Sequence, residues 1–202
     1  MSWFYTLAYA IGWKPWEAAA AREGARITAL YEREERERGR PYGAALDLGC
    51  GTGLHAVELA KRGWEVTGVE IVPKALREAR ERVRAAGVEV RLVEADVTAL
   101  RAAGIGSGFR LVLDFGVFHG LSEAQRQAMA AEVTSVAAPG ALLLMIAFDP
   151  GRRGPLPRGA SRSEIEATYS RWKVVGEEVL PAPPLPGPLR NSNPHVYQLR
   201  RD

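Results

Sequence analysis

From Ala44 onward, short apolar runs alternate with amphipathic segments whose apolar residues recur at helical spacing. This alternation is typical of parallel strands connected by helices that cover both faces of one sheet. The apolar runs predict strands at Ala44–Leu48, Glu65–Glu70, Val88–Val93, Leu111–Phe115 and Ala141–Phe148. The sequence therefore predicts an α/β fold with a Rossmann-like, doubly wound sheet.

The segments between the first strands predict helices over about Leu54–Arg62 and Pro73–Ala86. A glycine follows each of them, as is common where a helix ends. Pro73 suits the first helical position, because the N–H that proline lacks would have no partner there.

Two capping boxes predict helix starts in the second half of the chain. The first is Ser122–Gln125, and Pro139-Gly140 is expected to end the helical region that follows it. The second is expected from Ser163 and Glu166, before a short helix that ends near Ser170.

Two segments near the C-terminus, Trp172–Leu180 and His195–Arg200, alternate enough to predict an antiparallel pair of strands. Between them, Pro181–Pro188 holds five prolines in eight residues and is expected to be a loop. The whole pattern predicts seven strands with the last pair antiparallel.

The first forty residues differ from the rest of the chain. Glu17–Arg38 predicts a helix whose last part, Glu32–Arg38, is almost wholly charged and is expected to be solvated. We expect residues 1–40 to form an aromatic arm with a helical cap, and residues 41–202 to form one globular unit. The arm could act as a lid, a dimer contact or an interfacial membrane helix, of which the last has too poor a polar face. Its six aromatic residues are Trp3, Phe4, Tyr5, Tyr9, Trp13 and Trp16.

Composition narrows the class of protein. A chain of 202 residues, 47% of them hydrophobic, suits a single core, and a net charge of +3 is too small to indicate a nucleic-acid binder. Cys50 is the only cysteine, which excludes an intramolecular disulfide and suits a reducing cytoplasm. No apolar run is long enough to span a bilayer. With three dispersed histidines, no metal site is expected.

The strongest chemical signal is the segment Asp47–Gly53, which lies directly after a predicted strand and directly before a predicted helix. Its glycines alternate, so the backbone can turn sharply and approach a ligand while the helix start presents free N–H groups. This arrangement indicates a nucleotide-like ligand. A dinucleotide fingerprint would need a glycine at position 54, where this chain has Leu54.

This segment resembles motif I of the class I S-adenosylmethionine-dependent methyltransferases. The resemblance implies S-adenosyl-L-methionine as cofactor, with Glu70 accepting both ribose hydroxyls, Asp96 accepting the adenine amino group, and Asp114 lining the methionine end. Without that resemblance, Glu70 could be a solvated strand end and Asp96 a helix N-cap. The full set of cofactor residues that it implies is Asp47, Gly49, Cys50, Gly51, Gly53, Glu70, Ile71, Asp96, Val97 and Asp114.

A finer similarity is to the small-molecule methyltransferases of the tellurite-resistance and thiopurine group, through Pro15-Trp16-Glu17 and the segment Asp114–His119. In that group the N-terminal arm folds over the cofactor. The similarity implies an acceptor pocket bounded by Trp16, Phe118 and His119. It also implies a small-molecule acceptor, with a thiol or another soft nucleophile leading.

Methyl transfer is an in-line displacement that needs alignment and the exclusion of water more than a dedicated base. If a proton must leave the acceptor, His119 is the candidate general base and Asp114 a second candidate catalytic residue. Alternatively, His119 hydrogen-bonds a neighbouring loop. His55 is expected to be a solvated helix residue, and His195 a strand entry.

Two other functions stay open at this stage. The fold could bind the cofactor without transferring methyl, as a sensor or a non-methylating catalyst. It could also methylate nucleic acid or protein, although no basic stripe and no Asn/Asp-Pro-Pro-Tyr segment is present. The oligomeric state cannot be predicted from this sequence.

Overall fold

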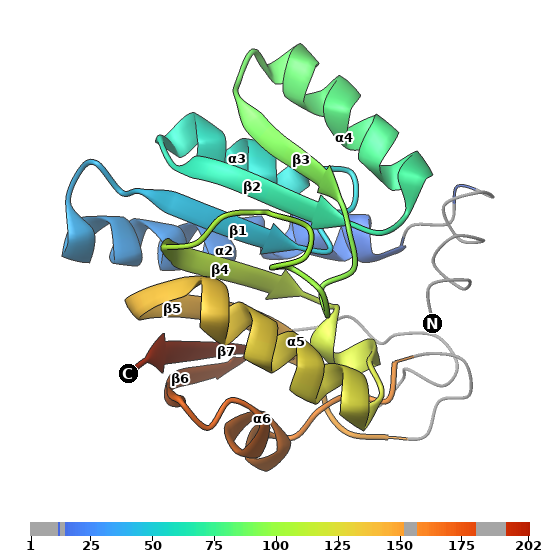
Figure 1. Cartoon of the computed structure of the whole chain (residues 1–202), viewed down its shortest axis with the longest axis vertical. Coiled ribbons are helices and arrows are strands. Elements are labelled where there is room, and N and C mark those ends of the chain that lie inside the picture. Colours follow the sequence, from blue (N-terminus) through green and yellow to red (C-terminus); the bar gives the residue numbers. More distant parts are fainter. Residues whose placement is uncertain (1–11, 13–14, 152–156, 181–192) are drawn as a thin grey trace.

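The computed structural model describes residues 12, 15–151, 157–180 and 193–202, without the side chains of residues 15–23. In this part of the chain, seven strands form one sheet in the order β3-β2-β1-β4-β5-β7-β6 (Figure 1). The strands are β1 Ala44–Leu48, β2 Glu65–Glu70, β3 Val90–Glu94, β4 Phe109–Phe115, β5 Ala137–Phe148, β6 Trp172–Val179 and β7 Pro194–Arg201.

The first five strands run parallel, and β7 runs antiparallel between β5 and β6. In Figure 1 the arrowheads of β1 to β4 point one way and that of β7 points the other. Leu48 pairs with Asp114 and Glu70 with Glu94, so the carboxyl ends of β1, β2, β3 and β4 meet at one edge. The predicted doubly wound sheet with antiparallel last strands is therefore confirmed.

Helices cover both faces of the sheet because its central strands bury alternate residues on opposite sides. On β4, Leu111 and Leu113 pack in one core cluster with residues of α2 and α3, whereas Val112 packs in another with residues of α5 and α6. This is what a strand buried on both faces requires. The helices are α2 Pro15–Arg38, α3 Leu54–Arg62, α4 Pro73–Ala86, α5 Glu123–Val136 and α6 Arg162–Thr168, with a short 3-10 turn, η1, at Phe118–Gly120.

The predicted helix before β1 is present, and α2 packs on the sheet through Ile27 and Tyr31. Five of the six aromatic residues expected in the arm, at positions 3, 4, 5, 9 and 13, lie outside the described residues, as does the side chain of Trp16. The division into an arm of residues 1–40 and a unit of residues 41–202 stays a prediction.

The predicted end of α5 was wrong. The helix ends at Val136, and β5 begins at once with Ala137, which pairs with Phe109. The strand then runs through Pro139-Gly140 with a register shift before Leu111 pairs with Leu142. The bulge lets proline and glycine lie in a strand, a position they rarely take in a regular ladder.

The second capping box is also not the one predicted. Ser161 Oγ accepts from the backbone N–H of Glu164 at 3.2 Å, and Glu164 Oε2 accepts from the N–H of Ser161 at 2.9 Å. Ser163 and Glu166 lie within α6, where Glu166 pairs with Arg162 at 2.8 Å. The Ser-x-x-Glu spacing occurs twice in six residues, and only the position of the helix start selects between them.

The end of α2 is solvated on one side only, which corrects part of a prediction: Glu32, Arg33, Arg36 and Glu37 are exposed, whereas Glu34 and Glu35 are buried. Glu34 is only 1% exposed and receives both Nη atoms of Arg200, at 2.9 and 2.8 Å, and an ion pair from Arg38. Glu35 accepts from Arg62 at 2.8 and 2.7 Å and from the indole of Trp64 at 3.1 Å. The ion pair of Glu34 with Arg200 thus joins α2 to β7, and that of Glu35 with Arg62 joins α2 to α3.

Candidate functional site

The glycine turn after β1 takes a conformation that only glycine adopts freely. Gly49, Gly51 and Gly53 have φ angles of 62°, 53° and 79°, and Gly53 is the N-cap of α3. A Cβ atom on Gly49 would overlap Cγ2 of Val117, which belongs to the loop after β4. The turn is therefore closely packed on one side and presents its backbone, followed by the start of α3, at the carboxyl edge of the sheet.

Three carboxylates from adjacent strands meet beside this turn. They are Asp47 on β1, Glu70 on β2 and Asp114 on β4, and all three are buried. Burial, the Glu70 carboxylate and the Asp114 carboxylate raise the pKa of Asp47 to about 7. Burial likewise raises the pKa of Asp114 to about 6. The edge therefore carries a concentrated negative potential that would favour a cationic ligand group.

One carboxylate oxygen in this cluster has no partner. Asp47 is 3% exposed, and its Oδ2 is buried without a hydrogen bond to any described residue. A buried polar atom without a partner costs free energy, so native proteins rarely keep one unless a ligand or water completes it. Such an atom beside a glycine turn marks this edge as a candidate binding site.

Glu70 shapes the turn from the neighbouring strand. Its Oε2 accepts from the N–H of Gly51 at 3.0 Å, and its Oε1 accepts from the N–H of Val72 at 2.8 Å. Burial nevertheless raises the pKa of this carboxyl above its ordinary value. Glu70 is therefore not a solvated strand end. A role in binding ribose hydroxyls stays a prediction.

Asp96 lies one strand further along the same edge. Its Oδ1 accepts from the backbone N–H of Thr98 at 2.8 Å and from the hydroxyl of Thr98 at 2.7 Å. The carboxylate thus closes a local turn, as in a helix cap, and its side chain stays partly accessible. An apolar residue follows both Glu70 and Asp96. Ile71 is 44% exposed, whereas Val97 is buried.

The other two predicted cofactor residues are set deeper. Cys50 is buried, and a Cβ atom on Gly68 of β2 would lie 2.9 Å from its Sγ, so the thiol fills the space that this glycine leaves. Burial and the charges of Asp47 and Glu70 raise the pKa of the thiol well above its usual value. Asp114 is fully buried, and its Oδ1 accepts from the N–H of Val117 at 2.8 Å.

Two of the three predicted acceptor residues, Phe118 and His119, lie in η1, and the side chain of the third, Trp16, lies outside the described residues. The Phe118 side chain is fully buried in the core, and its part in bounding an acceptor pocket stays a prediction. His119 is buried, its ring stacks on that of Phe148 with centroids 5.0 Å apart, and its Nδ1 accepts from the N–H of Phe148 at 3.2 Å. A proton taken at Nδ1 would break this bond. The geometry matches the alternative in which His119 holds a neighbouring segment, and a role as general base stays a prediction.

Arg126 of α5 was not singled out from the sequence. Its guanidinium is buried and donates to the carbonyls of Phe118 and His119, each at 3.0 Å, and of Gly159 at 2.6 Å. Burial lowers the pKa of this guanidinium to about 10. Arg126 joins the loop after β4 to the segment after β5, and no local sequence motif predicts this role.

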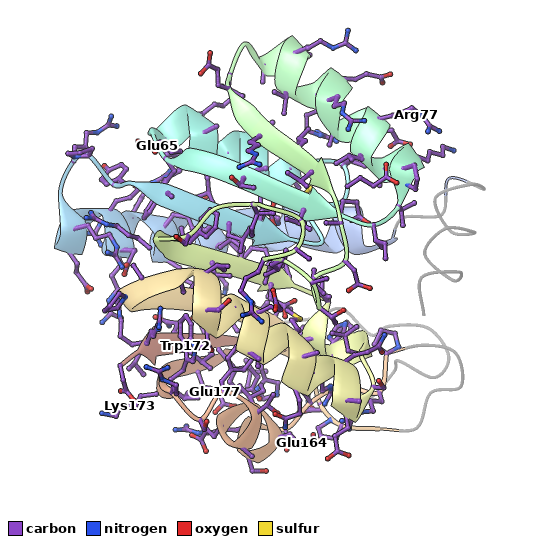
Figure 2. The ribbon with its side chains drawn as sticks, in the orientation of Figure 1. Glu65, Arg77, Glu164, Trp172, Lys173 and Glu177 are labelled. Atoms are coloured by element: carbon purple, nitrogen blue, oxygen red, sulfur yellow. The ribbon has the colours of Figure 1, made fainter. Side chains whose placement is uncertain are left out.

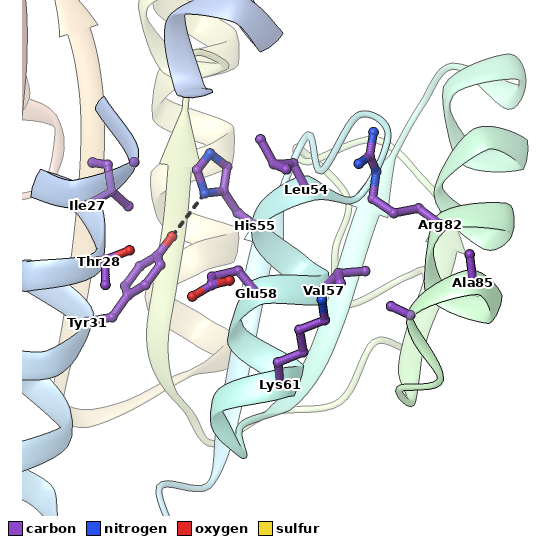
Figure 3. A pocket seen from close by; sticks show the side chains of 12 residues that line it. Ile27, Thr28, Tyr31, Leu54, His55, Val57, Glu58, Lys61, Arg82 and Ala85 are labelled. Carbon is purple, nitrogen blue, oxygen red and sulfur yellow. Dashed lines mark hydrogen bonds between the residues drawn. The ribbon is translucent and has the colours of Figure 1, made fainter. Parts of the chain in front are cut away.

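His55 was expected to be solvated, and that expectation was wrong. Figure 3 shows its ring against the phenol of Tyr31, with Nδ1 3.2 Å from the hydroxyl oxygen. The edge of the ring packs on Phe115, and burial lowers the pKa of His55 to about 4. The imidazole is therefore neutral at pH 7. It lines a pocket of about 460 Å³ between α2, α3 and α4.

His195 is the second residue of β7, so the predicted strand entry is confirmed. Its ring nitrogens lie 3.0 Å from Glu177 Oε1 and 2.9 Å from Asp149 Oδ1. The described residues contain no group of three or more side chains that could hold a metal ion. Nor does any described helix have the length and apolar character needed to cross a membrane.

Comparison with known proteins agrees with this geometry. Residues 45–140 match the family model described as a methyltransferase domain. The chain is 29% identical over 152 residues to the 2-heptyl-1-hydroxyquinolin-4(1H)-one methyltransferase of Mycobacteroides abscessus, and the matched region covers 72% of this chain. The match spans 65% of that relative's own length, which is less than two thirds.

Two solved structures share the fold. N-methyltransferase NodS from Bradyrhizobium japonicum WM9, in complex with S-adenosyl-L-homocysteine, is similar with a TM-score of 0.69 at 18% identity, covering 89% of this chain and 87% of that one. TehB from Haemophilus influenzae is similar with a TM-score of 0.65 at 17% identity, covering 79% and 57%. Residues 45–140 therefore form a methyltransferase domain, and the strand order and the glycine turn give it the fold of the class I S-adenosylmethionine-dependent methyltransferases.

Proposed function

We propose that this chain transfers the methyl group of S-adenosylmethionine to a small-molecule acceptor, with a thiol or another soft nucleophile as the leading acceptor class. One observation carries the proposal. The unpartnered Oδ2 of Asp47 lies among three buried carboxylates, directly beside a glycine turn that opens a helix.

The residues present fit this cofactor. S-Adenosylmethionine carries a sulfonium and an ammonium group at its methionine end, and the potential of Asp47, Glu70 and Asp114 favours both. The glycine backbone at positions 49–53 allows close approach of this end. Glu70 and Asp96 would accept from the ribose and the adenine amino group, and the exposed Ile71 would pack on the adenosine. Cys50 and Gly68 would contribute through the shape of the turn.

Bound S-adenosylmethionine supplies an electrophilic methyl group on a positively charged sulfur. In the proposed reaction the acceptor's lone pair forms the new bond to carbon, the carbon–sulfur pair returns to sulfur, and the acceptor's proton leaves to solvent. The protein's own contribution is to hold the loop after β4 in place. Asp114 binds the N–H groups of Val117 and Phe118, and Arg126 binds the carbonyls of Phe118 and His119.

The small-molecule acceptor is supported by the relatives, and the choice of a thiol or another soft nucleophile rests on the N-terminal residues. The curated relative is named for a hydroxyquinolone, and TehB belongs to the tellurite-resistance group that the Pro15-Trp16-Glu17 segment resembles. We also infer a cytoplasmic setting, which would keep the thiol of Cys50 reduced. No nucleic-acid partner is expected from a net charge of +3.

The first test is calorimetric titration with S-adenosylhomocysteine, with NAD as the control ligand. We expect micromolar binding of the first and no binding of the second, because position 54 lacks the third glycine of the dinucleotide fingerprint. Binding of neither ligand would contradict the proposed function.

A second test supplies S-adenosylmethionine with panels of thiols, aromatic hydroxyls and amines and measures the release of S-adenosylhomocysteine. We expect turnover with a member of the thiol panel. Cofactor binding without product across all panels would instead favour a sensor or a non-methylating catalyst. Methylation of RNA, DNA or protein with a salt-sensitive gel shift would favour the macromolecular alternative.

A further inference from the structure

The environment of Asp47 differs from that of the two carboxylates next to it. Glu70 and Asp114 each accept backbone N–H groups at both of their oxygens, Glu70 from residues 51 and 72 and Asp114 from residues 117 and 118. Asp47, by contrast, has one contact that lowers its pKa, a hydrogen bond from the backbone N–H of Ala56. Its Oδ2 has no partner in the described structure. A buried carboxylate with an open oxygen and two acidic neighbours is an unfavourable place for negative charge.

The groups that face Asp47 from each neighbouring element do not offset this charge. Glu70 faces Asp47 from β2, and Asp114 faces it from β4. Tyr31 faces it from α2, and burial and the charge of Asp47 raise the pKa of this phenol well above its ordinary value. The thiol of Cys50 is likewise neutral. On α3, His55 is uncharged at pH 7 because burial lowers its pKa to about 4. None of these groups is a cation at neutral pH.

We propose that Asp47 is a proton-linked cation site, which carries a proton in the ligand-free protein and releases it when a cationic ligand group binds beside its open oxygen. This inference rests on the proposed function, because the cation is the methionine end of the methyl donor. The carboxyl O–H bond breaks, the proton passes to the buffer, and the ligand's positive charge replaces it. No electrons are exchanged.

The proton linkage of Asp47 would also act after methyl transfer. Methyl transfer converts the sulfonium to a neutral thioether and releases one proton from the acceptor. If the sulfonium is the cation that faces Asp47, its loss favours the return of a proton to Asp47, so the negative charge does not stay uncompensated.

The experiment is calorimetric titration of the full chain with S-adenosylmethionine and, separately, with S-adenosylhomocysteine. Each titration is run at pH 6 and pH 7 in phosphate and in bis-Tris, whose ionisation enthalpies differ. The difference in heat between buffers gives the number of protons released. With a pKa of about 7, we expect about half a proton at pH 7 and close to one at pH 6, with affinity rising accordingly toward pH 8.

The two ligands identify the cation. Both carry the ammonium group, but only S-adenosylmethionine carries the sulfonium. Proton release with both ligands assigns the ammonium to Asp47, and release with S-adenosylmethionine alone assigns the sulfonium; either result supports the inference. Binding with a heat that does not depend on the buffer would overturn it while leaving the proposed function intact. Absence of binding by either ligand would overturn both.

Variants assign the proton to its residue. Asp47→Asn keeps the shape of the side chain, and we expect it to abolish the proton release. The matched control is Glu65→Gln, an exposed carboxylate at the opposite end of β2 from Glu70 (Figure 2), which should release as many protons as the wild type. An unchanged proton count in Asp47→Asn would overturn the assignment.

A measurement on the wild type covers the case in which Asp47→Asn does not fold. Carboxyl 13C NMR of the ligand-free protein should show two aspartates with raised midpoints, Asp47 at about 7 and Asp114 at about 6, and the signal of Asp47 should shift to that of a carboxylate when S-adenosylmethionine binds at pH 6. Aspartate signals that all titrate below pH 5 would overturn the inference.

Discussion

A Cβ atom on Gly49 would overlap Cγ2 of Val117, so the turn after β1 packs directly on the loop after β4. These two segments are 68 residues apart in the chain, and both lie at the carboxyl edge of the sheet. The glycine thereby couples the proposed cofactor turn to the proposed acceptor loop.

Substitution of Gly49 should disturb both segments. Gly49→Ala meets Val117 and has a φ of 62°, so we expect a loss of about 1 to 3 kcal/mol in the free energy of unfolding and at least a tenfold loss of S-adenosylhomocysteine affinity. The double variant Gly49→Ala/Val117→Ala removes the overlap but not the backbone strain. Urea denaturation and calorimetry should show partial recovery, and no recovery would mean that the φ angle alone matters.

Glu70 should matter to the cofactor more than its neighbour does. We expect Glu70→Ala to weaken S-adenosylhomocysteine binding by about 1 to 3 kcal/mol, because two charge-assisted hydrogen bonds and the support of Gly51 are lost. Glu94, which pairs with Glu70 across β2 and β3 and is exposed, supplies the control Glu94→Ala. Equal affinities for the two variants by calorimetry would remove Glu70 from the site.

His119 offers a test between a structural and a chemical role. His119→Ala should lower the free energy of unfolding by about 1 to 3 kcal/mol, because the N–H of Phe148 loses its acceptor and the ring its stacking partner. His119→Asn can still accept from Phe148 and should keep most of this stability. We expect His119→Asn to keep methyl transfer also. A folded His119→Asn variant that binds S-adenosylhomocysteine normally but no longer turns over would support a general base instead.

Asp47 should make the protein less stable as the pH rises. Its pKa is about 7 when folded and near 3.8 when unfolded, so the folded state binds the proton more tightly. The stability from this proton is fully present below about pH 4 and is lost as the pH rises through 7. Relative to Asp47→Asn, wild-type stability should therefore fall by on the order of 3 kcal/mol between pH 4 and pH 8. Urea denaturation across this range tests it, and parallel profiles for the two proteins would contradict it.

The local signals that predicted the fold act over a few residues. Apolar spacing located β1 and β2 at their observed bounds, and Gly63 and Gly87 marked the ends of α3 and α4. The glycines at 49, 51 and 53 also predicted the turn, because positive φ angles are a property of each residue. These features could be predicted because backbone geometry and side-chain periodicity are local.

Burial and charge neighbours depend on contacts far along the chain, and these only the tertiary structure decided. Glu34 is buried because Arg200, 166 residues away, reaches it. His55 is neutral because Tyr31 and Phe115 enclose it. Asp47 was predicted as a cofactor residue, but its raised pKa follows from its burial in the folded protein and from the sheet order that places Glu70 and Asp114 on either side. The sequence by itself determined which elements form and where the ligand turn lies, whereas the packing of distant strands and helices decided which charged groups are paired, buried or left open.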